Sequence, residues 1–243
     1  MKIDVLTLFP EMFNGVLNES IIGRAIDNNI VDINYTNIRD YSNNKHNKVD
    51  DYPFGGGPGM VMKPGPIHRA IEDVKSKDSR VIYLTPKGKV FNQSMAQELS
   101  KESHLIFLCG HYEGIDNRVI DNYVTDCVSI GDFVMTGGEL PAMVVIDSTV
   151  RLLPGVLSSK NAYMDESHYE GILEYPQYTR PRTYEGKTVP EVLLSGNHKK
   201  IKEWKKYEAL KNTYEIRPDL LEKKNLTKEE HKLLEKIKKE IGK

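Results

Sequence analysis

Two glycine-containing stretches are the most informative parts of the sequence: GHYEGID at residues 110–116 and IGDFVMTGGELP at residues 130–141. Each directly follows an apolar, strand-like run, Leu105–Cys109 in the first case and Cys127–Ser129 in the second. A shorter turn, Thr85–Gly88, follows another such run. Parallel strands of an open α/β sheet end at one edge, where ligands bind, and glycine lets the backbone approach a ligand closely. Each turn alone is compatible with an ordinary strand-to-helix connection, but the three together predict one shared pocket.

Strand-like and helix-like segments alternate along the rest of the first 156 residues. This alternation predicts an α/β fold with a parallel sheet and helices on both faces. The expected strands are Lys2–Phe9, Val31–Ile38, Arg80–Thr85, Leu105–Gly110 and Asp126–Gly131. The expected helices are Glu11–Asn28, Ile67–Lys77, Asn92–Lys101 and Glu139–Leu153.

A long loop, Arg39–Pro66, interrupts the alternation. Loops of this length inside a compact domain are unusual and often functional. Its centre reads FGGGPGM at residues 54–60 and follows Asp50 and Asp51. Because glycines leave the backbone uncovered, a flat base or a phosphate can approach this surface closely. The alternative is a flexible tip with no role.

Several classes of protein are excluded or disfavoured by what the sequence lacks. The first strand is followed by Phe9–Phe13 instead of GxGxxG, which excludes a dinucleotide-binding Rossmann fold, and no P-loop motif occurs. No apolar run approaches the roughly 18 residues that a membrane span needs. Asp4 and Glu11 do not fit a signal peptide. Two cysteines, Cys109 and Cys127, make neither a metal cluster nor a disulfide framework, so a cytoplasmic protein is expected.

The C-terminal part differs in charge from the rest of the chain. Residues 157–170 are polar and without clear periodicity and are interpreted as a linker, and residues 171–243 are interpreted as a small all-α domain. Asn197 is expected to cap a lysine-rich helix, and Thr227 with Glu230 to form the capping box of the last helix. Gly196–Lys243 carries a net charge of +6, so the other residues carry −7 of the overall −1. This asymmetry is typical of a protein that binds a polyanion, although solvated helix faces would give the same pattern.

Several long segments, in order, resemble one known family. They are LTLFPEMF (6–13), VDDYPFGGGPGM (49–60), VIYLTPKG (81–88), CGHYEGIDNRV (109–119), SIGDFVMTGGELPAM (129–143), RLLPGVL (151–157), YPQYTRPR (175–182) and VPEVLLSGNH (189–198). Along almost its whole length the chain resembles the TrmD family of tRNA (guanine-N1)-methyltransferases.

The resemblance implies a SPOUT fold, in which a deep trefoil knot lies at the carboxyl edge of the sheet. Knots are nearly absent from proteins, so pattern alone does not predict one. It further implies a homodimer with active sites between subunits, and S-adenosylmethionine bound among the knot loops. The implied cofactor residues are Tyr83, Leu84, Thr85, Pro86, Gly110, Tyr112, Glu113, Ile130, Gly131, Asp132, Phe133, Val134, Met135, Gly137, Gly138 and Pro141.

The implied reaction is methylation of N1 of the guanosine immediately 3′ of the anticodon. A carboxylate is a suitable general base for the N1 proton, and an arginine would stabilise the charge that develops on O6. The family's arginine matches Arg151. Without the resemblance, Arg151 would be interpreted as a cation that the dipole favours at the C-terminus of a helix. Its base, an aspartate before a serine and an aromatic residue, matches Glu166, with Asp165 as the alternative after a shift of one residue. His168 replaces the aromatic residue, so this stretch departs from the family pattern.

The resemblance also implies where tRNA binds. Asp50, Gly55, Pro58, Gly59 and His198 match positions near the substrate. The basic C-terminal part would neutralise phosphates, and the target loop offers bases that can stack on aromatic side chains. The family is associated with magnesium, although no dedicated metal-ligand cluster stands out in the sequence.

Three other functions remain open at this point. A SPOUT methyltransferase acting on another RNA would share the glycine turns, but the GGGPGM and YTRP segments disfavour it. A non-catalytic RNA-binding module is favoured only by the unusual Glu166. A metabolic nucleotide-dependent enzyme is disfavoured by the basic C-terminal part and the missing phosphate motifs.

Overall fold

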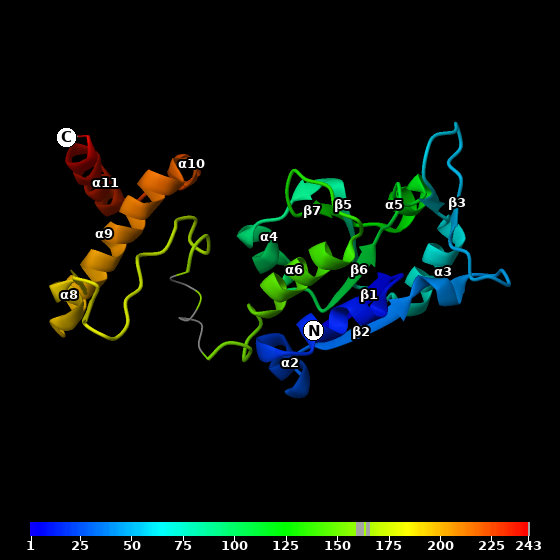
Figure 1. The fold of residues 1–243 in the computed structure, drawn as a ribbon, viewed down its shortest axis with the longest axis horizontal. Helices are drawn as coiled ribbons and strands as arrows, with labels where there is room; N and C mark the ends of the chain where they lie inside the picture. The colour runs from blue at the N-terminus through cyan, green and yellow to red at the C-terminus, as the bar shows by residue number, and fades with distance from the viewer. Residues whose placement is uncertain (159–162, 164–165, 243) are drawn as a thin grey trace. The chain divides into compact units, whose positions relative to one another are not determined.

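The computed structural model describes residues 1–158, 163 and 166–242. The chain forms two compact units, Met1–Ser159 and Lys160–Lys243, which Figure 1 colours from blue to green and from yellow to red. Each unit has its own hydrophobic core. No helix within the described ranges combines the length and the apolar character that crossing a membrane requires.

A five-stranded sheet forms the centre of the first unit, in the order β2-β1-β6-β5-β7. Every pairing in it is parallel, which confirms the predicted sheet. Its strands are β1 (Lys2–Thr7), β2 (Asp32–Asn37), β5 (Ser79–Val90), β6 (His104–Cys109) and β7 (Asp126–Ser129).

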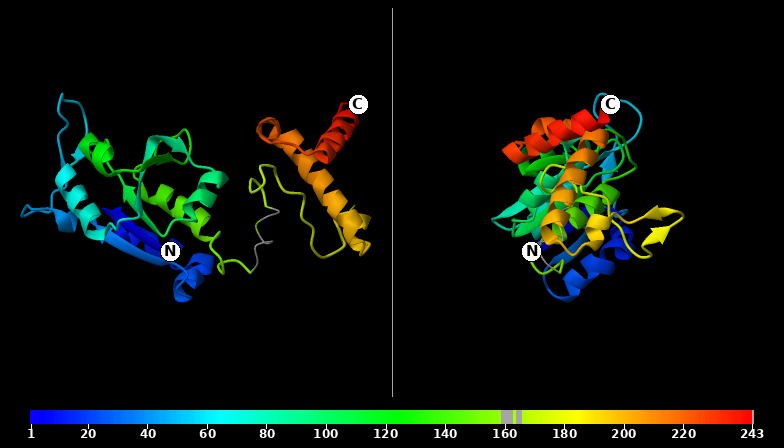
Figure 2. Two further views of the ribbon diagram at one scale, coloured as in Figure 1. Left: turned by 180° about the vertical axis from the view of Figure 1, so that it is seen from behind. Right: turned by 90° about the vertical axis from the view of Figure 1, so that its left-hand side faces the viewer.

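Helices cover both faces of this sheet (Figures 1 and 2), as the alternating pattern predicted. One face carries η1 (Pro10–Phe13), α1 (Asn14–Leu17), α2 (Ser20–Asp27), α4 (Gln93–Leu99) and α6 (Glu139–Val150). The other face carries η2 (Ile38–Tyr41), α3 (Pro64–Val74) and α5 (Asn117–Tyr123).

The fully buried strand β6 supplies both cores. Leu105, Phe107 and Cys109 belong to the core under α6, and Ile106 and Leu108 belong to the core under α3. Successive side chains of a strand point to opposite faces, so a strand covered on both sides reads as a continuous apolar run.

Three segments differ from their predicted structure. The single helix expected at Glu11–Asn28 is broken near Asn18, whose carbonyl oxygen lies 2.4 Å from where a Cβ of Gly23 would be. Ser20, with a φ of 55°, starts the next helix there. The expected loop Arg39–Pro66 contains an antiparallel ladder between β3 (Asp50–Asp51) and β4 (Val61–Met62). Helix α5, which the pattern did not predict, begins where the Asp116 carboxylate accepts a hydrogen bond from the Arg118 amide.

The second unit is mainly helical. Its helices are α8 (Glu191–Leu194), α9 (His198–Ile216), α10 (Pro218–Lys223) and α11 (Lys228–Ile241). Leu210, Leu221, Leu234 and Ile237 form its core. Asn197 caps α9, and Thr227 with Glu230 forms the capping box of α11, so both predicted helix starts are confirmed. This unit is not purely helical, because β8 (Thr183–Tyr184) and β9 (Lys187–Thr188) form a short hairpin.

Replacement of Gly88 by alanine should destabilise the first unit. A Cβ at Gly88 would lie 2.4 Å from the Val128 amide nitrogen in the neighbouring strand, so β5 and β7 would have to separate. We expect the free energy of unfolding to fall by about 1–3 kcal/mol, the usual cost of overpacking.

The matched control is Gly15→Ala in α1, where nothing lies within 4 Å of the added Cβ. Alanine favours a helix over glycine by about 0.5–1 kcal/mol, so this variant should be as stable as the parent or more so. Urea denaturation of both variants measures the difference. Equal midpoints for the two would contradict the close packing at Gly88.

Candidate functional site

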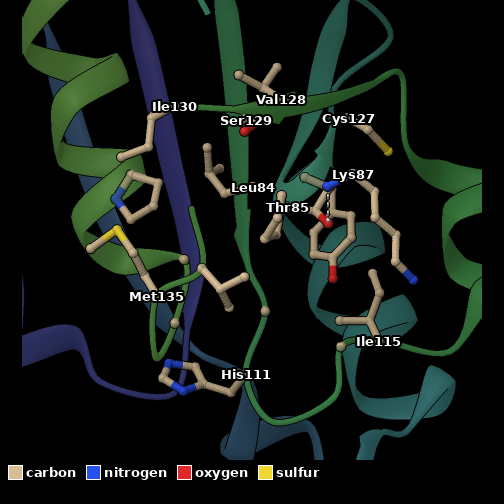
Figure 3. Close-up of a pocket in the computed structure, with 18 of the residues that line it drawn as sticks. Leu84, Thr85, Lys87, His111, Ile115, Cys127, Val128, Ser129, Ile130 and Met135 are labelled. Carbon is tan, nitrogen blue, oxygen red and sulfur yellow. Dashed lines mark hydrogen bonds between the residues drawn. The ribbon is translucent and has the colours of Figure 1, made fainter. Parts of the chain in front are cut away.

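A cavity of about 550 Å³ lies at the carboxyl edge of the sheet, between the turns that follow β5, β6 and β7 (Figure 3). The three glycine-containing turns of the sequence therefore share one pocket. Every residue predicted to bind the cofactor lines this cavity, except Asp132. Residues outside the predicted cofactor set also line it: Lys87, His111, Gly114, Ile115, Asn117, Ile120, Cys127, Val128, Ser129 and Thr136. Most of them lie inside or beside the quoted turns, but Asn117 and Ile120 belong to the unpredicted helix α5.

The first wall of the cavity is an irregular part of β5. The strand pairs with β7 up to Leu84, leaves the ladder, and pairs again from Lys89, where Lys89 faces the same Val128 as Leu84. The intervening residues, Thr85–Gly88, bulge out of the sheet. The absence of a side chain at Gly88 lets the returning strand lie directly against the backbone of Cys127 and Val128.

Contact between two backbones forms the second wall. The amide of Gly138 donates to the carbonyl of Gly110 at 3.0 Å. A Cβ at Gly138 would lie 2.8 Å from the Cα of Cys109, and a Cβ at Gly110 would lie 2.8 Å from the Tyr83 ring. Only glycine permits this approach. The turn after β6 and the start of α6 are therefore held together with their peptide groups close to the cavity.

A buried carboxylate supports this wall from behind. Glu139, which is 1% exposed, lies in the first turn of α6. Its Oε1 accepts a hydrogen bond from the Thr7 hydroxyl at 2.6 Å, and its Oε2 lies 2.7 Å from Nε2 of His111. The partial positive charge at the N-terminus of α6 also stabilises the negative charge of this carboxylate. The carboxylate thus joins the end of β1, the turn after β6 and the start of α6.

Burial shifts the titration of three groups at the site. It raises the pKa of the Tyr83 phenol above its ordinary value. It also raises the pKa of the Cys127 thiol, on the cavity wall, and the pKa of the Cys109 thiol, which is fully buried and near the Glu139 carboxylate. These groups are therefore neutral at neutral pH, and neither thiol is an activated nucleophile.

The glycine-rich loop adjoins the cavity. Met62 forms backbone hydrogen bonds with Gly114 and Asp116 on the turn after β6. Gly59 lies directly against the Glu113 side chain, so a Cβ at this position would come within 2.4 Å of Oε1 of Glu113. Asp50 pairs with Met62 at the base of the loop.

The tip of this loop is solvent-exposed. Gly55 and Pro58 are exposed, and nothing lies within 4 Å of a Cβ at Gly55. The aromatic rings of Tyr52 and Phe54 are also exposed. The predicted substrate residues of the first unit thus form an open surface that starts at the cavity.

The predicted catalytic residues are divided between the two units. Arg151 is half-buried and caps the C-terminus of α6. Glu166 belongs to the second unit, where its amide donates to the carbonyl of Tyr163 and its carbonyl accepts from Tyr169. Ser167 Oγ accepts from the amide of Glu174, a residue whose carbonyl accepts from Asn212 of α9. Asp165 lies outside the described residues.

The second unit carries an aromatic and basic surface. Trp204 on α9 contacts Tyr175 and Tyr178, with ring centroids 6.5 and 6.3 Å apart. Lys205 lies over the Tyr175 ring at 4.4 Å. His198 is exposed at the first residue of α9. Within the described ranges, no three His, Cys, Asp or Glu side chains gather in a group that could hold a metal ion.

Comparison with known proteins agrees with the resemblance. The family model described as "tRNA (Guanine-1)-methyltransferase TrmD" matches residues 1–223. A tRNA (guanine-N(1)-)-methyltransferase of Staphylococcus carnosus is 57% identical over 99% of both chains. The proteins of the same name from Alkaliphilus oremlandii, at 58% identity over 98% of this chain and 99% of the relative, and from Clostridium novyi, at 59% over 99% of both, are similarly close. The chain belongs to the TrmD family of tRNA (guanine-N1)-methyltransferases.

Proposed function

We propose that this protein transfers a methyl group from S-adenosylmethionine to N1 of the guanosine immediately 3′ of the anticodon in tRNA. The observation that carries the proposal is the glycine-walled cavity at the carboxyl edge of the sheet, in a chain of this family. The tRNA substrate and the N1 position follow from membership of the family. The identity of the methyl donor and the position of the guanosine beside the anticodon are proposals that the experiments below test.

The cavity suits S-adenosylmethionine in size and lining. Its volume of about 550 Å³ is typical of sites for small ligands. Apolar side chains such as Ile130 and Pro141 can cover an adenine ring, and the peptide groups near Gly110 and Gly138 can accept or donate hydrogen bonds. When bound, S-adenosylmethionine supplies a methyl group on a positively charged sulfur.

We assign the proton transfer to Glu166, with Asp165 as the alternative. N1 of guanine is a poor nucleophile until its proton leaves, and a carboxylate held within hydrogen-bond distance can accept that proton. Arg151 would stabilise the negative charge on O6 as the proton leaves. The turn that holds Glu166 is linked through Ser167 and Glu174 to helix α9, so the second unit would bring the base to the target nucleotide.

A homodimeric SPOUT enzyme accounts for this division of the site. We propose that residues 1–156 form the knotted catalytic domain, residues 157–170 the linker and residues 171–243 the tRNA-binding domain. Exposed apolar side chains on the neighbouring elements η1, α1 and α6 support a subunit interface: Met12, Val16, Leu140 and Val144. An active site shared between subunits would unite Arg151 and the cavity with the partner's second unit.

The tRNA would contact the open loop and the basic second unit. Gly55, Pro58 and Gly59 expose backbone for a base next to Glu113 and the cavity. The lysines of α9 and α11 would neutralise phosphates, and Trp204 offers a ring for stacking. We expect such an enzyme to work in the cytoplasm, and the magnesium requirement that the resemblance implies stays a prediction.

The substrate assignment predicts strict dependence on the target base. With labelled S-adenosylmethionine, a tRNA transcript carrying guanosine 3′ of the anticodon should accept a methyl group, and a transcript with adenosine there should not. Scintillation counting and nuclease mapping of the product would measure this. Equal labelling of both transcripts would point to another RNA position, and labelling of neither, despite cofactor binding, to a non-catalytic RNA-binding protein.

The base assignment predicts a difference between two neighbouring substitutions. Glu166→Gln should lower the single-turnover rate about 10²–10⁴-fold, because an amide cannot accept the N1 proton. Binding of S-adenosylhomocysteine should stay unchanged. Asp165→Asn is the matched control and should retain most of the activity. The reverse pattern would assign the base to Asp165, and full activity in both variants would exclude a base from this pair.

The cavity assignment predicts selective protection of Cys127 from alkylation. Thiolate is the reactive form, and the pKa of both thiols is raised. Alkylation of Cys127 by iodoacetamide should therefore be slow at neutral pH. Its rate should rise with pH, with a midpoint above the ordinary thiol value of about 8.5.

Cys109 is buried and serves as the internal control, which should react only on unfolding. Peptide mass spectrometry would measure both sites with and without S-adenosylhomocysteine. A Cys127 rate that does not change with saturating ligand would contradict binding in this cavity.

A further inference from the structure

The wall of the cavity carries two opposite charges. Among the described lining residues, Lys87 is the only lysine or arginine, and Glu113 is the only aspartate or glutamate. Neither forms an ion pair with another described residue. The remaining wall is mostly glycine and apolar side chains, so these two charges set the electrostatic character of the cavity.

The backbone at Lys87 is held in place on both sides. It lies in the Thr85–Gly88 bulge of β5, where its amide donates to the Thr85 hydroxyl at 3.4 Å. The contact of Gly88 with the β7 backbone anchors the other side of the bulge. In Figure 3 the Lys87 side chain lies at the end of the cavity that Cys127 and Ile115 also line, away from Ile130 and Met135. The positive charge of Lys87 is thus at one end of the cavity, and the apolar side chains of Ile130 and Met135 are at the other.

This arrangement matches a ligand that is apolar and flat at one end and zwitterionic at the other. On the proposed function, the ligand is S-adenosylmethionine, whose amino-acid tail carries a carboxylate and an ammonium group beside the sulfonium. Glu113 attracts the positive groups but repels the carboxylate, so the carboxylate needs a cation of its own. We infer that Lys87 binds the α-carboxylate of the methyl donor and that it selects for ligands that carry this group.

The inference rests on the proposed function and concerns a specificity-determining residue of the same site. A second role for an exposed lysine at this edge would be contact with a tRNA phosphate. No other lysine or arginine among the described lining residues could pair with the carboxylate, and a carboxylate placed near Glu113 without a partner would weaken binding, which favours this role for Lys87.

The test compares two ligands that differ only in the carboxylate. Isothermal titration calorimetry would measure the affinity of the parent and of Lys87→Met for S-adenosylhomocysteine and for its decarboxylated analogue. We expect Lys87→Met to lower the affinity for S-adenosylhomocysteine about tenfold, which is the usual effect of losing a partly exposed hydrogen bond between charged groups. The decarboxylated analogue should bind both proteins equally, and Lys87→Arg should keep most of the affinity.

Lys89→Met is the matched control. This substitution removes the same charge from the same strand, at a residue that is also exposed but does not line the cavity. It should change the affinity for neither ligand. Affinity of each variant for the tRNA transcript, measured by filter binding, should equal that of the parent.

Each other outcome overturns the inference. Unchanged binding of S-adenosylhomocysteine to Lys87→Met would show that Lys87 does not hold the carboxylate. If Lys87→Met lowers the affinity for both ligands equally, Lys87 shapes the cavity and does not bind the carboxylate. If it lowers only the affinity for tRNA, Lys87 contacts a phosphate. If the folded parent binds neither ligand, the proposed function itself fails, which is distinct from failure of the Lys87 variant alone.

Discussion

The close contact between the backbones at Gly110 and Gly138 is the constraint on which the site depends. It brings the turn after β6 against the first turn of α6, and no residue with a side chain fits between them. The buried Glu139 carboxylate then fixes the same junction by bonding Thr7 and His111, from two other elements. Because an unpaired buried carboxylate is costly, these two bonds favour the arrangement in which the three elements meet beside the cavity.

The two units carry different parts of the proposed chemistry. The first unit holds the cavity, Arg151 and the glycine-rich loop, and the second unit holds Glu166 and the basic and aromatic surface. Within the first unit the loop and the cavity wall are in direct contact. Met62 is hydrogen-bonded to the turn that carries Glu113, and Gly59 packs against the Glu113 side chain. A base seated on the loop would therefore lie beside the ligand in the cavity.

Much of this architecture follows from local pattern. Apolar runs bounded by glycine turns gave the central strands, and capping residues gave the starts of α9 and α11, since both signals act over a few residues. The pattern failed where a close backbone contact, whether local or distant in sequence, decides the structure. The excursion and return of β5 depend on the backbone of β7, and the break near Asn18 depends on the room that Gly23 leaves. Asp132 lies within a lining turn but does not line the cavity, because sequence position in a turn does not fix the direction of each side chain.

The pairing of β1 with both β2 and β6 has a consequence for the order of folding. Asp4 on β1 bonds His104 on β6 across 100 residues of chain, and Thr7 bonds Glu139 across 132. Contacts of such long range must overcome a large loop-closure entropy before they contribute stability, and they slow folding. During synthesis the N-terminal strand emerges first but finds its central neighbour only after β6 has left the ribosome. The cavity, which also needs α6, is therefore among the last parts of the first unit to form.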